Sequence, residues 1–140
     1  MLFQLLDWIR YVKLRRKLTP AHALGRRGED LAHRHLQRRG YRVVARNFVP
    51  RSGHGDLDIV AWDQDRLVIV EVKTRTSAEY GDPDRSINRE KERNLLRVGR
   101  EYAGRCGVEW KQVRFDVVSI VFQPRPSLLH EKDVLSLRGS

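Results

Sequence analysis

The stretch GDLDIVAWDQDRLVIVEVKTR, residues 55–75, contains two apolar runs separated by a polar turn. The runs have the length and composition of β-strands, so the stretch is predicted to form a hairpin with Gln64 and Asp65 in its turn. Buried strands seldom carry charged side chains, yet four lie within these runs. They are Asp56, Asp58, Glu71 and Lys73.

The antiparallel register of this hairpin determines which residues face one another. With the turn centred on Gln64 and Asp65, Asp58 lies opposite Glu71, and Asp56 lies opposite Lys73. Because side chains alternate along a strand, the four charges are predicted to share one face. The other face is apolar throughout and is predicted to pack on a core. Its residues are Leu57, Ile59, Ala61, Val68, Val70 and Val72.

Two carboxylates placed directly opposite each other repel, because paired Cβ atoms lie only about 4.5–5.5 Å apart. A divalent cation would compensate Asp58 and Glu71, since Mg²⁺ usually takes one or two carboxylates and keeps water and phosphate oxygens as its other ligands. Lys73 would then orient a nucleophile or stabilise developing charge on a phosphoryl group. The alternative is a solvated face on which Lys73 bridges both carboxylates without a metal.

The net charge of +10 favours a polyanionic partner such as nucleic acid. The charge is unevenly distributed along the chain: residues 1–50 hold 12 Lys and Arg against 3 Asp and Glu, whereas residues 51–90 hold 6 against 9. The predicted hairpin lies in this acidic middle region. Carboxylates concentrated within a basic protein are the pattern expected of a cation site that faces a nucleic acid.

The length of 140 residues predicts a single domain. Cys106 is the only cysteine, which excludes a disulfide framework and a thiolate zinc site and favours the cytoplasm. The apolar start of the chain is interrupted by Asp7 and Arg10, so we expect neither a membrane anchor nor a signal peptide. His33, His35 and His54 lack a zinc-ligand spacing and are expected at the surface.

Hydrophobic periodicity predicts an α/β domain with the order α-α-β-β-β-α-β, in which a helical crossover makes the last strand parallel to a neighbour in the sheet. A basic amphipathic helix over residues 2–17 forms an N-terminal extension, residues 1–20. The domain itself, residues 21–123, is predicted to hold a mixed sheet flanked by helices, and residues 124–140 are a weakly specified tail. Its predicted elements are a helix over 25–40, a strand over 41–48, the two hairpin strands, a polar loop over 76–84, a helix over 86–104 and a strand over 113–122.

The hairpin sequence resembles the D-x(n)-E-x-K core of the PD-(D/E)XK nuclease superfamily. Asp58 stands at the D position, and after twelve intervening residues Glu71-Val72-Lys73 stands at E-x-K. A longer likeness covers about Gly25 to Ile120. The run GRRGEDLAHRHLQRRGYRVVARNF, followed by GDLDIVAWD, LVIVEVKTR and FDVVSI, resembles the YraN-like family of small bacterial proteins. That resemblance implies a restriction-endonuclease-like fold, distant similarity to archaeal Holliday-junction resolvases, and an endonuclease that uses Mg²⁺ or Mn²⁺ to hydrolyse DNA phosphodiesters.

The resemblance implies a role for several acidic residues. Asp58 matches the acid that ends the family's G-E-x-D motif, and Glu71 with Lys73 matches E-x-K, so these three are the implied catalytic residues. Asp58 and Glu71 would hold the metal, together with Glu29, which matches a helix glutamate in resolvase-like relatives. Glu29 is equally explained as an acid that the helix dipole favours in a first turn. Asp56 stands where the family usually has Glu. Its implied role is that of a supporting residue beside the metal ligands, and the alternative is that it holds Lys73, which lies opposite it.

Basic residues around the implied site are candidates for contacts with nucleic acid. Arg26 and Arg27 on the first predicted helix of the domain would steer the phosphate backbone. Arg75 and Lys91 could hold a phosphate, although exposed arginines and lysines on strand ends and helices are common. Asp116, in the last predicted strand, is expected to have a structural or supporting role.

Two classes of function follow from these residues. In the first, the protein is an endonuclease in which a metal-bound water attacks a phosphodiester with the assistance of Lys73. In the second, the same fold is a basic nucleic-acid-binding module that holds no metal and cuts nothing. The first is favoured, because carboxylates repel phosphates and add nothing to a surface that only binds. The likeness to resolvases also makes a homodimer conceivable.

Overall fold

The structure, a computed structural model, describes residues 20–53, 55–77 and 89–135. Within these ranges the chain forms α2, β1, β2, β3, α3, β4 and β5 in order, with a short 3-10 helix, η2 Trp110–Gln112, before β4. None of the described helices combines the length and apolar character needed to cross a bilayer. The predicted helix over residues 2–17 and most of the predicted loop over 76–84 lie outside the described residues.

The strands form one mixed five-stranded sheet in the order β1-β2-β3-β4-β5. β3 and β4 are parallel, and the other neighbouring strands are antiparallel. The predicted α/β class is therefore confirmed. The last predicted strand, which follows the predicted helix over 86–104, is β4, and its predicted parallel pairing is also confirmed. The strands are β1 Arg42–Phe48, β2 Leu57–Asp63, β3 Arg66–Ser77, β4 Val113–Gln123 and β5 Ser127–Glu131.

Helix α2, Pro20–Arg38, begins earlier than predicted and ends where expected. Pro20 at its first position has the φ of a helical residue and no N–H to satisfy. At the other end Gly40 adopts φ 87°, a conformation that glycine enters without steric cost. The amide of Tyr41 then donates to the Leu36 carbonyl at 2.9 Å, and that of Gly40 donates to the Gln37 carbonyl at 3.0 Å. This Schellman motif turns the chain into β1.

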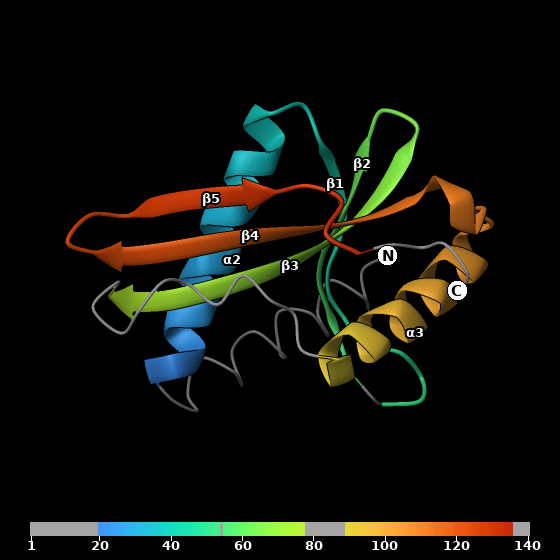
Figure 1. The fold of residues 1–140 in the computed structure, drawn as a ribbon, viewed down its shortest axis with the longest axis horizontal. Helices are drawn as coiled ribbons and strands as arrows, with labels where there is room; N and C mark the ends of the chain where they lie inside the picture. Colours follow the sequence, from blue (N-terminus) through green and yellow to red (C-terminus); the bar gives the residue numbers. More distant parts are fainter. Residues whose placement is uncertain (1–19, 54, 78–88, 136–140) are drawn as a thin grey trace, which may run out of the picture.

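Helices α2 and α3, Arg89–Cys106, cover two separate clusters of core residues. Figure 1 shows α2 crossing the strands on the far side of the sheet, with α3 lying apart from it. The cluster under α2 includes Ala32, Leu36, Ile59, Ala61, Val68, Val70, Val118 and Ile120. The cluster under α3 includes Leu57, Val60, Leu67, Ile69, Leu95, Val98, Val113 and Phe115.

The predicted apolar face of the hairpin is confirmed except at Leu57. Ile59, Val68 and Val70 belong to the cluster under α2, and Val72 packs against it, but Leu57 belongs to the cluster under α3. Leu57 pairs with Phe48 of β1, which follows Asn47. Asn47 has φ 52°, so the regular alternation of side chains along β1 is interrupted beside Leu57. The prediction was wrong at Leu57 because it assumed a regular β2–β3 ladder there, whereas the paired residues end at Ile59↔Val70.

Strand β5, Ser127–Glu131, lies in the segment that was predicted to be a weakly specified tail. It pairs antiparallel with β4, from Val117↔Glu131 to Val121↔Ser127. The chain then continues back along β4, and the amide of Val134 donates to the Phe115 carbonyl at 2.8 Å. The prediction missed this strand because its short sequence, SLLHE, has no clear period, and the edge of β4 supplies its hydrogen-bonding partners.

Gly28 allows α2 to lie close to β3. A Cβ built on Gly28 would lie 1.7 Å from Thr74 Cγ2, whereas one built on Gly25 would meet nothing within 4 Å. The two glycines of the GRRGE segment therefore have different roles. Gly28 is required where the helix contacts the strand that carries Glu71 and Lys73, and Gly25 is not required by packing.

We expect Gly28→Ala to destabilise the protein by about 1–3 kcal/mol, because the added methyl group forces α2 away from Thr74. Gly25→Ala should instead stabilise it by up to about 1 kcal/mol, since alanine is the better helix former. Urea unfolding of both variants provides the measurement. Thr74→Ser removes the clashing methyl group and should restore part of the loss in Gly28→Ala; a double variant with no recovery would contradict the proposed contact.

Candidate functional site

The β2–β3 hairpin has the predicted register. Its paired residues run from Asp63↔Arg66 at the turn to Ile59↔Val70, where the ladder ends. Beyond that point the side chain of Asp58 bridges the strands, and its Oδ2 accepts a hydrogen bond from the Val72 amide at 2.8 Å. This bond holds the Asp58 carboxylate against the backbone beside Glu71. The two acids are brought together by a side-chain contact beyond the end of the ladder.

The Asp58 carboxylate lies in an environment that disfavours its charge. Burial raises the pKa of Asp58 well above its ordinary value, and the neighbouring charge of Glu71 raises it further. The Val72 amide opposes this effect, while Glu29 and Asp56 add smaller contributions in the raising direction. Three acids that the sequence had singled out therefore repel the charge of Asp58: Glu71 and Asp56 near the hairpin and Glu29 on α2.

Glu71 forms an ion pair with Lys91 of α3. The Glu71 residue is only 6% exposed, whereas nearly half of the Lys91 side chain is open to solvent. Burial alone would lower the pKa of Lys91, but its hydrogen bond and attraction to Glu71 raise it overall. The sequence had placed Lys91 at a phosphate. In the structure its ammonium group neutralises one of the two implied metal ligands.

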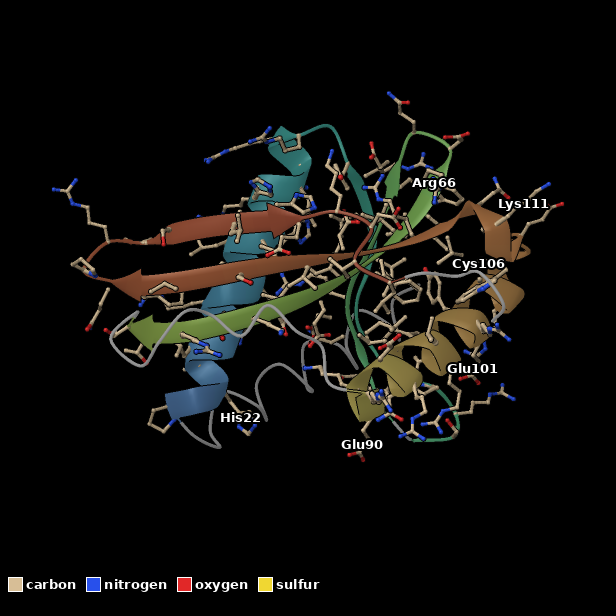
Figure 2. All side chains as sticks on the ribbon, viewed as in Figure 1. His22, Arg66, Glu90, Glu101, Cys106 and Lys111 are labelled. Carbon is tan, nitrogen blue, oxygen red and sulfur yellow. The ribbon has the colours of Figure 1, made fainter. Side chains whose placement is uncertain are left out.

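A pocket of ≈ 290 Å³ opens beside Glu71, between the N-terminal half of α3 and the chain that leads into β2. Figure 2 shows Glu90 at the start of α3. Carboxylate, ammonium and amide groups of the pocket wall face a space large enough for several water molecules or a phosphate group. The wall is formed by Gly55, Asp56, Glu71, Glu90, Lys91, Asn94 and Leu95.

Glu29 lies on α2 and is buried, with only 9% of its surface exposed. Its Oε2 is 3.4 Å from Arg46 of β1, which also contacts Asp30 at 2.9 Å. Among residues 20–53, 55–77 and 89–135, no three His, Cys, Asp or Glu side chains are placed to hold a metal ion together. Asp58 and Glu71 therefore remain the two candidate metal ligands. The role of Glu29 as a third ligand stays a prediction.

The remaining basic candidates lie on β3 and α2. Lys73 and Arg75 are partly buried in β3, where they pair with Ser119 and Val121 of β4. On α2, the guanidinium carbon of Arg27 lies 4.8 Å from the centre of the Phe122 ring. Arg26, next to it, is partly exposed. These positions do not test the predicted contacts of the four residues with nucleic acid, which stay predictions.

Asp116 is at the centre of a separate buried network and is only 1% exposed. Arg114 donates to Asp116 Oδ1 at 2.9 Å, and His130 Nε2 lies 2.8 Å from Oδ2. Burial acts to raise the pKa of Asp116, but the bonds from His130, Arg114 and the Asp133 amide lower it overall. The structural or supporting role expected of Asp116 stays a prediction. No pattern in the sequence pointed to His130, because no element was predicted around it.

Comparison with known proteins places the chain in a family. The profile of a family described as "Uncharacterised protein family UPF0102" matches residues 28–120. The chain belongs to UPF0102. A UPF0102 protein of Solibacter usitatus is 47% identical over 116 residues, which are 83% of this chain and 87% of that protein. A UPF0102 protein of Persephonella marina is 40% identical, over 81% of this chain and 93% of its own.

The half-buried Asp58 and the buried Asp116 should respond in opposite ways to replacement by asparagine. Between the ordinary aspartate pKa and the raised pKa of Asp58, the folded protein keeps a proton that the unfolded chain has lost, so stability falls as pH rises through that window. Asp58→Asn removes this effect and can still accept from Val72. We expect its Tm at pH 7 to exceed that of the wild type, with the gain vanishing near pH 4.

Asp116→Asn serves as the contrasting variant. The lowered pKa of Asp116 means that its charge stabilises the fold above the ordinary aspartate value and ceases to do so as pH falls through the lowered value. At pH 7 the substitution should cost about 1–3 kcal/mol, because Arg114 loses one of its two carboxylate partners and keeps only its ion pair with Asp63. Thermal melts followed by circular dichroism give both results, and equal losses in the two variants would contradict the assignment.

Proposed function

We propose that this UPF0102 protein is a metal-dependent endonuclease that hydrolyses DNA phosphodiester bonds, with a site built on Asp58, Glu71 and Lys73. The observation that carries the proposal is the closeness of Asp58 to Glu71 at the end of the β2–β3 ladder, where the charge of Glu71 raises the pKa of Asp58. Such repulsion lowers stability, and structural packing has no need of it. A bound cation would turn the repulsion into attraction.

Mg²⁺ or Mn²⁺ fits this donor set. Mg²⁺ commonly uses one or two protein carboxylates and fills its other positions with water and phosphate oxygens. Asp58 and Glu71 provide two carboxylates, and the pocket of ≈ 290 Å³ beside Glu71 leaves space for the remaining ligands. When bound, such an ion would neutralise phosphate charge and lower the pKa of a coordinated water.

The chain's own residues have separable roles in this proposal. Val72 holds the Asp58 carboxylate in place through its amide. Lys73 follows on β3 and would stabilise the charge that develops on the phosphoryl oxygens. Lys91 neutralises Glu71 in the structure and would turn to a substrate phosphate once Glu71 engages a cation. Arg26, Arg27 and Arg75 would contact the phosphate backbone, which is consistent with the net charge of +10.

The Glu71–Lys91 ion pair supports a second candidate function. Because Lys91 already neutralises Glu71, the acidic pair can persist without a metal. A nucleic-acid-binding module of the same fold would use its basic surface and leave the acids as structural groups. The endonuclease would require Asp58 and Glu71 for cleavage of a phosphodiester bond, whereas the binding module would cleave none.

The decisive experiment incubates purified protein with duplex, single-stranded, nicked and branched DNA, in Mg²⁺, in Mn²⁺ and in chelator. We expect metal-dependent cleavage that falls by about 100-fold or more in Asp58→Asn, Glu71→Gln and Lys73→Met. Asp65→Asn removes an exposed acid in the hairpin turn and should cleave as the wild type does. Retention of every DNA without cleavage by any of these proteins would select the binding module instead.

Replacing Lys91 should separate metal binding from cleavage. Lys91→Gln removes the ammonium group that competes for Glu71, so we expect Mn²⁺ to bind about tenfold more tightly while cleavage becomes slower. Calorimetric titration of Mn²⁺ measures the first effect, and single-turnover cleavage measures the second. Lys111→Gln, which removes an exposed lysine paired with the exposed Glu109, is the control. Weaker Mn²⁺ binding by Lys91→Gln would show that Lys91 does not occupy the metal position.

A further inference from the structure

A second pocket, also of ≈ 290 Å³, lies between the C-terminal half of α2 and the turn that joins β4 to β5. Figure 1 shows α2 passing behind β4 and β5. The pocket shares no lining residue with the one beside Glu71. Its wall is formed by Leu31, Arg34, His35, Arg38, Ile120, Pro126, Ser127 and Leu128.

The polar part of this wall carries only positive or neutral groups. Arg34 and Arg38 are four residues apart and so lie on the same face of α2. Their guanidinium groups are exposed, and the wall also contains the imidazole of His35 and the hydroxyl of Ser127. No Asp or Glu of residues 20–53, 55–77 or 89–135 lines the pocket. Planar guanidinium groups suit the paired oxygens of a phosphate group.

His35 connects the pocket to the buried Asp116 network. Its Nε2 lies 3.1 Å from Nδ1 of His130, and Nε2 of His130 lies 2.8 Å from Oδ2 of Asp116. An ionised Asp116 requires the proton of His130 on Nε2, which leaves Nδ1 as the acceptor for His35 Nε2–H. The chain of bonds therefore fixes both tautomers. One additional proton can be held on His35 without breaking any of them.

The electrostatic surroundings of His35 disfavour that additional proton. Burial lowers the pKa of His35, and its electrostatic interactions with His130, Arg39 and Arg38 lower it further. An anion in the pocket would oppose these effects. The groups that face the histidine pair are Arg38 and Arg39 on α2, Asp116 and Arg114 on β4, and the ring of Tyr41, whose centre lies 5.7 Å from that of His130.

We propose that this pocket is a binding site for a phosphate monoester, in which Arg34 and Arg38 hold the phosphate group and His35 becomes protonated as the anion binds. The volume is at the lower end for ligand pockets, which limits the ligand to inorganic phosphate or a phosphate on a small body. The apolar side chains of Leu31, Ile120 and Leu128 would contact that body. The site is independent of the proposed nuclease activity, because the two share no residue.

The test titrates the full chain with inorganic phosphate at constant ionic strength and follows the NMR signals of the His35 ring. We expect saturable binding that weakens at least tenfold in the double variant Arg34→Gln/Arg38→Gln. Arg93→Gln/Arg97→Gln makes the same change in charge on the exposed face of α3 and should bind as the wild type does. Equal weakening in both double variants would overturn the proposal, because only general charge would then be involved.

A second measurement tests the role of His35. Sulfate keeps its double charge between pH 5 and 8 and so isolates the histidine from the titration of phosphate itself. Saturation with sulfate should raise the pKa of His35 measured by NMR, and His35→Asn should abolish the tightening of sulfate binding as pH falls. His22→Asn, at the other end of α2, is the control. An unchanged His35 pKa in saturating sulfate would show that His35 takes no part.

Further titrations identify the source of the phosphate. A nucleoside 5′-monophosphate, a 5′-phosphorylated oligonucleotide and the same oligonucleotide without its phosphate are compared with inorganic phosphate. Preference for the monophosphate would assign a small-molecule site, and preference for the phosphorylated oligonucleotide would assign the end of a nucleic acid. If none binds more tightly than the unphosphorylated oligonucleotide, the pocket has no selectivity for a monoester and the proposal is wrong.

Discussion

The hydrogen bond from the Val72 amide to the Asp58 carboxylate is the contact on which the arrangement of the acidic residues depends. It forms where the β2–β3 ladder ends, so the carboxylate takes a place that a backbone carbonyl would otherwise fill. A buried carboxylate beside Glu71 is costly, and the raised pKa of Asp58 expresses that cost. The amide reduces the cost and fixes the geometry, which is how a fold can retain a charge pair that destabilises it.

The charges of the half-buried Asp58 and the buried Asp116 are compensated to different degrees. Asp116 is surrounded by donors from Arg114, His130 and the Asp133 amide, and its pKa is lowered. Asp58 has one backbone donor and acidic neighbours, and its pKa is raised. A fully satisfied network stabilises a fold, whereas an incompletely compensated one is the usual mark of a functional site. This contrast favours the region around Asp58 over that around Asp116 as a site of chemistry.

The two helices place different chemistry on the two sides of the sheet. Helix α3 brings Lys91 to Glu71 and forms the wall of one pocket. Helix α2 approaches β3 at Gly28, contributes Glu29, and carries the arginines and His35 of the second pocket. Membership of UPF0102 rests on residues 28–120, which include the acids of the hairpin, Lys91 and Asp116 but end before His130. The second pocket therefore draws on β5 residues outside the matched region.

The sequence by itself determined the hairpin, its register, the C-terminal end of α2 and the parallel crossover to β4, because these follow from short-range periodicity, turn chemistry and the handedness of strand connections. It also singled out Asp58 and Glu71 as charges within apolar strands. Only the tertiary structure decided that Lys91 neutralises Glu71, that Leu57 packs under α3, that β5 forms, and that His35 reaches Asp116 through His130. Each of these depends on contacts between residues far apart in the chain, and local patterns contain no record of which distant partner will be present.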